Sequence, residues 1–148
     1  MSTKTKKTFT KEVKAIEGTM IPFLCILDIA RQFDMHGSEH ELNGYTLAAS
    51  VGAIGREIVA TLDGVKLSED SPARTRLTDA SLMIIDLSII LDELSHDSDD
   101  WQDGMHSAVG VMTHAMALNA ARLVEAAAQF LGAKHLHGFS DPSFGSAK

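Results

Sequence analysis

Residues 78–95, TDASLMIIDLSIILDELS, decide the fold of this chain. Apolar residues recur there at spacings of three and four, which is the period of an amphipathic helix, and no strand-like alternation is present. The expected core face consists of Met83, Leu87, Ile90, Leu91 and Leu94. A second apolar stripe consists of Leu82, Ile85 and Ile89. We predict a helix with two apolar faces, the second of which is either covered by the chain itself or open to a partner.

Polar residues separate the two apolar faces. Asp86 and Glu93 form one polar line, and the other consists of Ser81, Ser88, Asp92 and Ser95. An exposed apolar stripe with a polar rim is typical of an interaction surface. Trp101 follows close to several acidic residues and is expected either to close the end of a bundle or to anchor an interface. The candidate partner-binding residues are therefore Leu82, Ile85, Asp86, Ile89, Glu93 and Trp101.

Helical periodicity extends over most of the chain. We predict three further main helices over 19–34, 38–62 and 98–131, and a shorter helical piece at 11–17 that ends at Gly18. Ser38 and Glu41 form a capping box at the start of the 38–62 helix. The fold class is all-α, a compact helical bundle of four main helices arranged as two helical hairpins. The expected organisation is a basic N-terminal arm (1–14), one helical-bundle domain (15–132) and a flexible C-terminal tail (133–148).

Several single residues carry structural expectations. Gly52 and Gly55 lie in mid-helix, where glycine is unfavourable, and so predict a close helix approach. Asn119 falls in a heptad-like apolar seam that runs from Met105 to Phe130 and is expected to specify helix pairing. Asp28 and Asp86 lie in apolar runs; either could be solvated, but we favour a buried contact with Arg56 or Arg122 that fixes the helix register.

Charge and composition exclude several classes of function. The chain has 148 residues and a net charge of −7, with five Lys and one Glu in residues 1–14 and no Lys or Arg between Arg76 and Arg122. A long acidic interval makes nucleic acid an unfavourable partner, and no apolar run is long enough to cross a membrane. The single cysteine, Cys25, lies in an apolar segment, is expected to be buried and inert, and fits a cytoplasmic location.

No catalytic constellation is recognisable. The sequence contains no nucleophile elbow, phosphate-binding glycine loop or dinucleotide fingerprint, and no Glu-x-x-His pair falls on a predicted helix. We therefore predict no catalytic residue, no metal site and no cofactor. The expected function is that of a non-catalytic helical regulator, adaptor or inhibitor that binds a protein partner and forms a homo-oligomer. The acidic interval favours a partner with a basic surface. The alternative is a sensor or enzyme that binds a small ligand or a metal through interior His and Asp residues.

Overall fold

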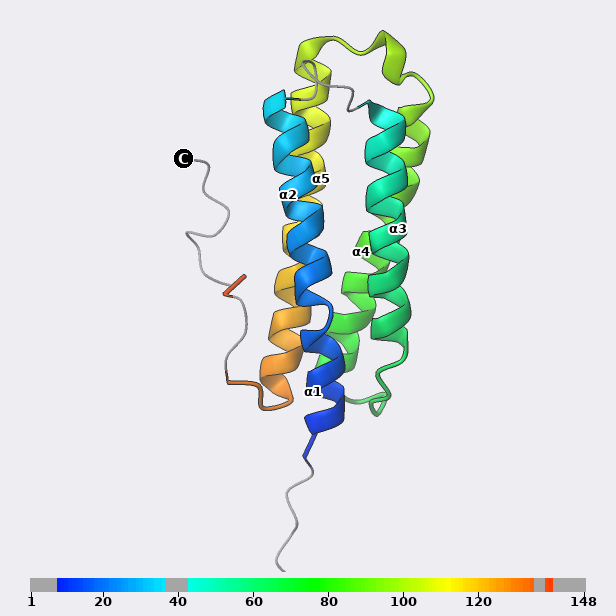
Figure 1. Ribbon diagram of the computed structural model, residues 1–148. Coiled ribbons are helices and arrows are strands. Elements are labelled where there is room, and N and C mark those ends of the chain that lie inside the picture. Colours follow the sequence, from blue (N-terminus) through cyan, green and yellow to red (C-terminus); the bar gives the residue numbers. More distant parts are fainter. Residues whose placement is uncertain (1–7, 37–42, 135–137, 140–148) are drawn as a thin grey trace, which may run out of the picture.

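The structure, a computed structural model, describes residues 8–36, 43–134 and 138–139. Four long helices, α2 (Met20–His36), α3 (Gly44–Asp63), α4 (Pro72–Ser95) and α5 (Asp103–Phe130), form an all-α bundle (Figure 1). A short helix, α1 (Thr10–Glu17), precedes them, and one 3-10 turn, η1 (Ser98–Asp100), connects α4 to α5. The predicted fold class is therefore confirmed.

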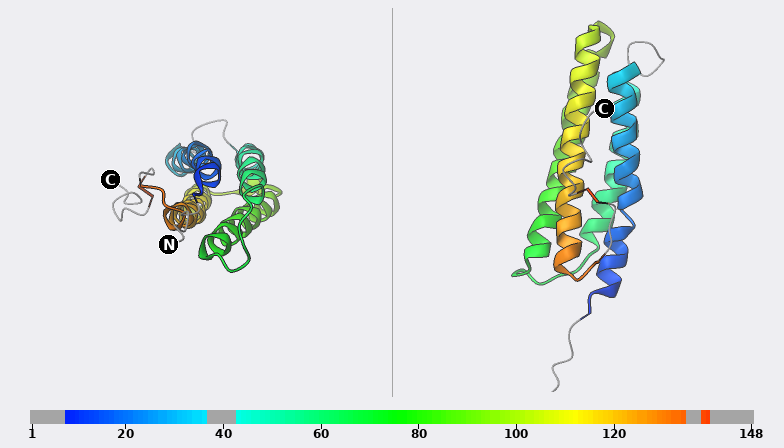
Figure 2. Two further views of the ribbon diagram at one scale, coloured as in Figure 1. Left: turned by 90° about the horizontal axis from the view of Figure 1, so that it is seen from below. Right: turned by 90° about the vertical axis from the view of Figure 1, so that its left-hand side faces the viewer.

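The four long helices surround one core. α5 packs against both α2 and α4, α3 packs against α4, and the contact between α2 and α3 is the least extensive of the four. The view along the bundle in Figure 2 shows α2 and α4 at opposite corners. α4 thus has neighbours on two sides and turns its inner face toward the centre, which leaves its outer face to solvent.

A helix break near Gly18 separates α1 from α2. The Thr19 hydroxyl donates to the carbonyl oxygen of Ile16 at 2.7 Å, and the Gly18 N–H donates to the carbonyls of α1. Ile16 is fully buried, so α1 is attached to the end of the bundle. The last residues of the expected basic arm, from Thr10 onward, are accordingly helical.

Two helix starts differ from the prediction. α3 begins at Gly44, where Asn43 caps it by accepting a hydrogen bond from the Thr46 N–H at 2.9 Å; the expected capping box at Ser38 lies outside the described residues. α4 begins at Pro72, six residues before the expected start at Thr78. Proline is well tolerated in the first turn of a helix, because its missing N–H would have no intrahelical partner there.

Small residues bring neighbouring helices into close contact. A Cβ atom added at Gly55 of α3 would lie 2.9 Å from Cγ2 of Ile84 in α4, so the close approach predicted there is confirmed. At Gly52 the nearest such atom is 3.8 Å away, at the Arg56 guanidinium, so that glycine is not required by packing. Gly110 of α5 lies directly against the backbone of Asp34 in α2, where an added Cβ would lie 2.7 Å from the Asp34 nitrogen.

The buried face of α5 coincides with the predicted seam only at Val109, which is 2% exposed. Asn119 is exposed, Phe130 is 56% exposed, and the methionines of the expected seam are half-buried. The fully enclosed side chains are instead mainly small, and include Thr113, Ala117, Ala120, Ala121, Val124, Ala127 and Ala128. The seam prediction was wrong because it favoured side-chain size, whereas closely spaced helices place alanine at the interface.

Candidate functional site

The candidate site is the outer face of α4. Leu82, Ile85 and Ile89, which we call the α4 stripe, are 53%, 40% and 57% exposed. At 100° per residue these three positions point away from Leu87 and Leu91, which are buried in the core. Among residues 8–36, 43–134 and 138–139, no segment buries the stripe, and its three side chains are exposed.

Acidic side chains border the α4 stripe. Asp86 and Glu93 are exposed on one side of it, and Asp92 is exposed on the other. No Lys or Arg occurs between Arg76 and Arg122, so no basic side chain from α4 itself lies among them. The stripe is thus an apolar strip of about two helical turns within a negatively charged surface.

The inner face of α4 is rotated from the prediction. Ser81 and Ser95, assigned to a polar line at the edge of the core, are 6% and 3% exposed. Met83, Ile90 and Leu94, assigned to the centre of the core, are only half-buried. Small side chains suit a face where α3 and α4 pack closely, and at Gly55 an added Cβ would meet Ile84 at 2.9 Å and the Ser88 hydroxyl at 3.4 Å.

Trp101 is separate from the α4 stripe. It is half-buried, its ring lies edge-on to that of Phe33 at 6.3 Å between centroids, and His106 lies 5.4 Å from it. Its ring also reaches the start of α3, since a Cβ atom at Gly44 would lie 3.0 Å from it. The tryptophan therefore packs across the end of the bundle near α2 and α3, which matches the first of the two roles considered for it.

Three predictions about buried polar and thiol groups are wrong. Asp86 and Asp28 are both exposed, and Asp28 accepts a hydrogen bond from Gln32 four residues later, so neither makes a buried contact with an arginine. Cys25 is also exposed, on the outer face of α2. Among the described residues, a different acidic side chain is buried: Glu125, at 2% exposure, lies within the run of alanines in α5. The position of this carboxyl group within a run of small apolar residues was the sequence pattern that could have indicated its burial.

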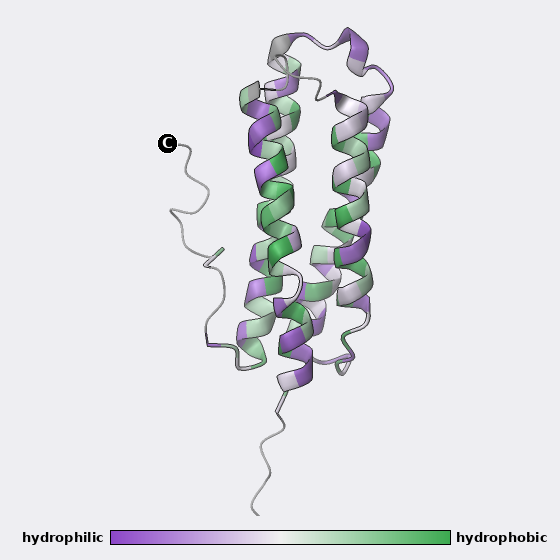
Figure 3. Cartoon of the chain, in the orientation of Figure 1, coloured by the Kyte–Doolittle hydropathy of each residue, from purple (hydrophilic) through white to green (hydrophobic). Residues whose placement is uncertain are grey.

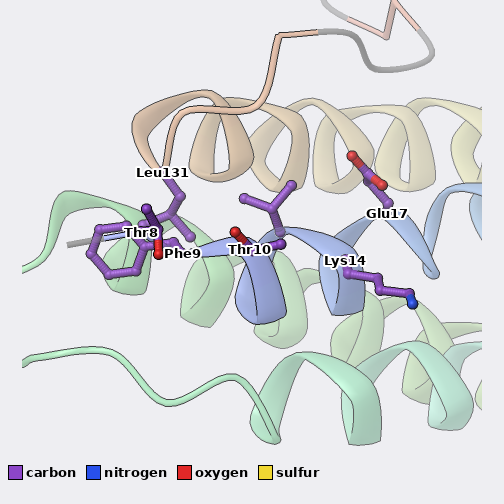
Figure 4. Close-up of a pocket in the computed structure, with 7 residues that line it drawn as sticks. Thr8, Phe9, Thr10, Lys14, Glu17 and Leu131 are labelled. Carbon is purple, nitrogen blue, oxygen red and sulfur yellow. The ribbon is translucent and has the colours of Figure 1, made fainter. Parts of the chain in front are cut away.

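Hollows also occur outside the α4 stripe, and two of them are lined by described residues. An open pocket of about 540 Å³ lies where α1 meets the end of α5. Figure 4 shows Phe9 beside Leu131 at one end of this pocket and Glu17 toward the other. A smaller hollow of about 270 Å³ lies between the end of α3 and the start of α4 and has Lys66, Arg74 and Ser81 in its wall. In the smaller hollow the Ser81 hydroxyl has no hydrogen-bond partner, and Lys66 donates to the Asp63 carbonyl oxygen at 3.3 Å.

One histidine has a perturbed environment. Burial lowers the pKa of His114, the positive charge of Arg31 acts in the same direction, and Asp34 opposes both. Its Nε2 atom is buried and has no hydrogen-bond partner. Within the described ranges, no group of three His, Cys, Asp or Glu side chains is placed to hold a metal ion.

Comparisons with known proteins add no relative: no protein-family model, no curated protein and no solved structure matches this chain. Among the described helices, none is long and apolar enough to cross a membrane. Figure 3 shows polar residues dominating the connection through η1, next to the acidic end of α4. The functional assignment therefore depends on the geometry of the α4 face.

Proposed function

We propose that this chain is a non-catalytic helical interaction protein, a regulator, adaptor or inhibitor, that binds its partner through the α4 stripe. The observation that carries the proposal is the exposure of Leu82, Ile85 and Ile89 on the side of α4 opposite the core. Solvation of three large aliphatic side chains in one line is unfavourable, and burying each remaining exposed part contributes on the order of 1 kcal/mol. A partner that covers the stripe recovers this free energy.

The spacing of the stripe suits a helical partner. Positions 82, 85 and 89 follow the three-and-four spacing with which helices pack side by side. A stable interface buries roughly 800 Å² on each side, which is more than three side chains supply, so the acidic rim has to contribute contacts. Asp86, Asp92 and Glu93 would complement Lys or Arg side chains beside the apolar face of the partner helix, and would accelerate association at low salt.

The same surface can also join two copies of the chain. A homo-oligomer formed through the α4 stripe would bury the apolar residues of both copies, but it would place two acidic rims close together. Self-association by this route should therefore strengthen as salt screens the rims, whereas binding to a basic partner should weaken. We place the protein in the cytoplasm, where the exposed thiol of Cys25 would remain reduced.

A double substitution in the stripe tests the proposal. Ile85→Asp/Ile89→Asp should abolish association while the helical circular dichroism and the unfolding midpoint change little, because both side chains are exposed. The matched control is Ile21→Asp, since Ile21 is 67% exposed on α2, at the opposite corner of the bundle. Self-association is measured by sedimentation equilibrium at low and high salt, and partner binding by affinity capture with all three proteins.

Two results would decide the matter. A dimer, or a captured partner, that persists with the Ile21 variant and disappears with the double variant supports the proposal. A wild-type chain that stays monomeric and captures nothing beyond what the double variant captures overturns it. Asp28 and Asp86 are exposed, which removes two of the interior polar residues that the alternative of an interior ligand or metal site requires.

A further inference from the structure

Phe139 is buried away from the α4 stripe, in the junction between α2 and α5. The segment after α5 turns at Gly132, whose φ of +98° favours glycine, and Phe139 then packs against the bundle with no exposed surface. Its ring meets that of Phe23 in α2 edge-on, with 6.5 Å between the centroids. Figure 2 shows this piece of the segment beside α5 and α2. Phe139 belongs to the stretch expected to be a flexible tail.

Two side chains of α5 hold the main chain of Phe139. The Nε atom of Arg122 donates to the Phe139 carbonyl oxygen at 2.6 Å, and the Phe139 N–H donates to Oε2 of Glu125 at 2.9 Å. Arg122 and Glu125 are three residues apart, so they project from the same face of the helix. Both hydrogen bonds involve a charged group, and such bonds are stronger than those between neutral groups.

The contacts recognise features that any peptide with a phenylalanine could present. The carboxylate needs a main-chain N–H, the guanidinium needs a carbonyl, and the apolar space beside Phe23 needs an aromatic ring. Gly138 adds one restriction, since its φ of +75° lies in the left-handed region that favours glycine. The segment that best satisfies all four conditions carries the dipeptide Gly-Phe.

We propose that Phe23, Arg122 and Glu125 form a binding site for a Gly-Phe peptide segment of a partner protein, and that the chain's own Gly138–Phe139 occupies this site as an intramolecular competitor. The carboxylate of Glu125, 2% exposed, stands in the apolar part of the bundle and is stabilised by a donor there. A partner segment that replaces Phe139 would supply the same donor. The site lies apart from the α4 stripe and does not depend on the function proposed for it.

Tethering makes the intramolecular occupant hard to displace. Phe139 follows the last residue of α5, Phe130, by nine positions, and a tether of this length holds its end at an effective concentration of the order of millimolar. A free peptide at micromolar concentration would therefore compete poorly with Phe139. Removing the phenylalanine ring from the full chain should open the site to a peptide in solution.

Fluorescence anisotropy with the full-length chain tests the proposal. The probe is a fluorescein-labelled peptide of residues 133–148, AKHLHGFSDPSFGSAK. The Phe139→Ala chain should bind this probe at least about tenfold more tightly than the wild-type chain, because the competitor is weakened. Adding Arg122→Ala to the Phe139→Ala chain, or replacing Phe139 or Gly138 by Ala in the probe, should weaken binding.

Matched controls distinguish this site from nonspecific binding and from the α4 stripe. Phe130→Ala removes an exposed ring near the same end of α5 and should leave the affinity at the wild-type level. Ile85→Asp/Ile89→Asp, combined with Phe139→Ala, should bind the probe as tightly as Phe139→Ala alone. Equal affinity of the wild-type and Phe139→Ala chains, or undiminished binding of the probe that lacks Phe139, overturns the proposal. Loss of cooperative unfolding in Phe139→Ala also overturns it, since Phe139 would then be an inseparable part of the core.

Discussion

Both faces of α4 carry large aliphatic side chains, including Ile84, Leu87 and Leu91 on the inner face, but only the inner face adds small ones. The inner face contains several small residues, which are Ala73, Ala80, Ser81 and Ser95. The outer face presents Leu82, Ile85 and Ile89 to solvent. The small inner residues are explained by the fold itself, because they let α3 and α5 pack closely against α4. The large outer residues contribute little to the stability of this fold. A partner that covers them would explain why they are large and apolar.

The largest effect on the free energy of unfolding is expected from a comparison of two adjacent isoleucines in α4. Ile84 is 1% exposed and touches the Gly55 position, whereas Ile85 is 40% exposed. Ile84→Asp buries an unpaired charge and should cost more than about 4 kcal/mol, which unfolds most of a marginally stable domain. Ile85→Asp should change the free energy of unfolding by less than about 1 kcal/mol. Urea unfolding followed by circular dichroism measures both.

An unfolded Ile85→Asp chain would break the comparison between the faces of α4. The outer isoleucine would then belong to the stability of the fold, and the α4 stripe would lose its interpretation as a surface for a partner. A folded Ile84→Asp chain would contradict the packing of α3 against α4.

A second prediction concerns the distance between α3 and α4. Gly55→Ala gains about 1 kcal/mol of helix propensity, but its Cβ would lie 2.9 Å from Ile84 Cγ2, and overpacking costs about 1–3 kcal/mol. The net expectation is a loss of about 1 kcal/mol. The matched control, Gly52→Ala, has only an ordinary contact at 3.8 Å and should gain up to about 1 kcal/mol. Thermal and urea unfolding should give opposite signs for the two variants; a gain at both positions would show that α3 and α4 are not closely packed there.

The third prediction tests whether the inward serines act through size alone. The Ser81 hydroxyl is buried without a hydrogen-bond partner, whereas that of Ser95 donates to the Asp92 carbonyl at 2.7 Å. Ser81→Ala should therefore stabilise the chain by up to about 1 kcal/mol, and Ser95→Ala should be neutral or cost about 0.5–1 kcal/mol. The difference between the two free energies of unfolding is the quantity to measure. A destabilised Ser81→Ala chain would indicate that its hydroxyl has a partner, such as water in the adjoining hollow.

Local patterns were sufficient to predict the fold class and the α4 stripe. The helical period of residues 78–95 places Leu82, Ile85 and Ile89 in one line on the surface of the helix. This placement follows from the sequence alone and does not depend on the positions of the neighbouring helices. Whether the line was exposed could not be predicted, because exposure depends on where α3 and α5 lie. The start of α4 differs from the predicted one because proline is typical both of a connection and of the first turn of a helix, and Pro72 takes the second role.

The buried polar groups could not be predicted from periodicity. Ser81 faces inward and Asn119 outward because closely packed helices select small side chains before apolar ones. The contact of Arg122 and Glu125 with Phe139 joins residues 14 and 17 positions apart through a turn at Gly132, and no helical pattern encodes such a return. The composition after position 132, rich in Gly and Ser, predicts a loose tail. Composition alone does not indicate that one phenylalanine in this stretch, Phe139, is buried.

The smallest expected effect concerns a polar group on the inner side of the bundle, His114. Burial lowers its pKa below the ordinary value of 6.5, so the unfolded chain binds the proton more readily than the folded chain. Stability should therefore fall as the pH drops below about 6.5 toward the lower pKa of the folded state. The side chain is only half-buried, and solvent screening keeps the effect small. His114→Gln should flatten this part of the curve of unfolding free energy against pH, measured by urea titration between pH 5 and pH 8. Parallel curves for the two proteins would mean that His114 is as accessible to protons as the outer residues of α4, and the inner side of the bundle would then be open to water near Asp34.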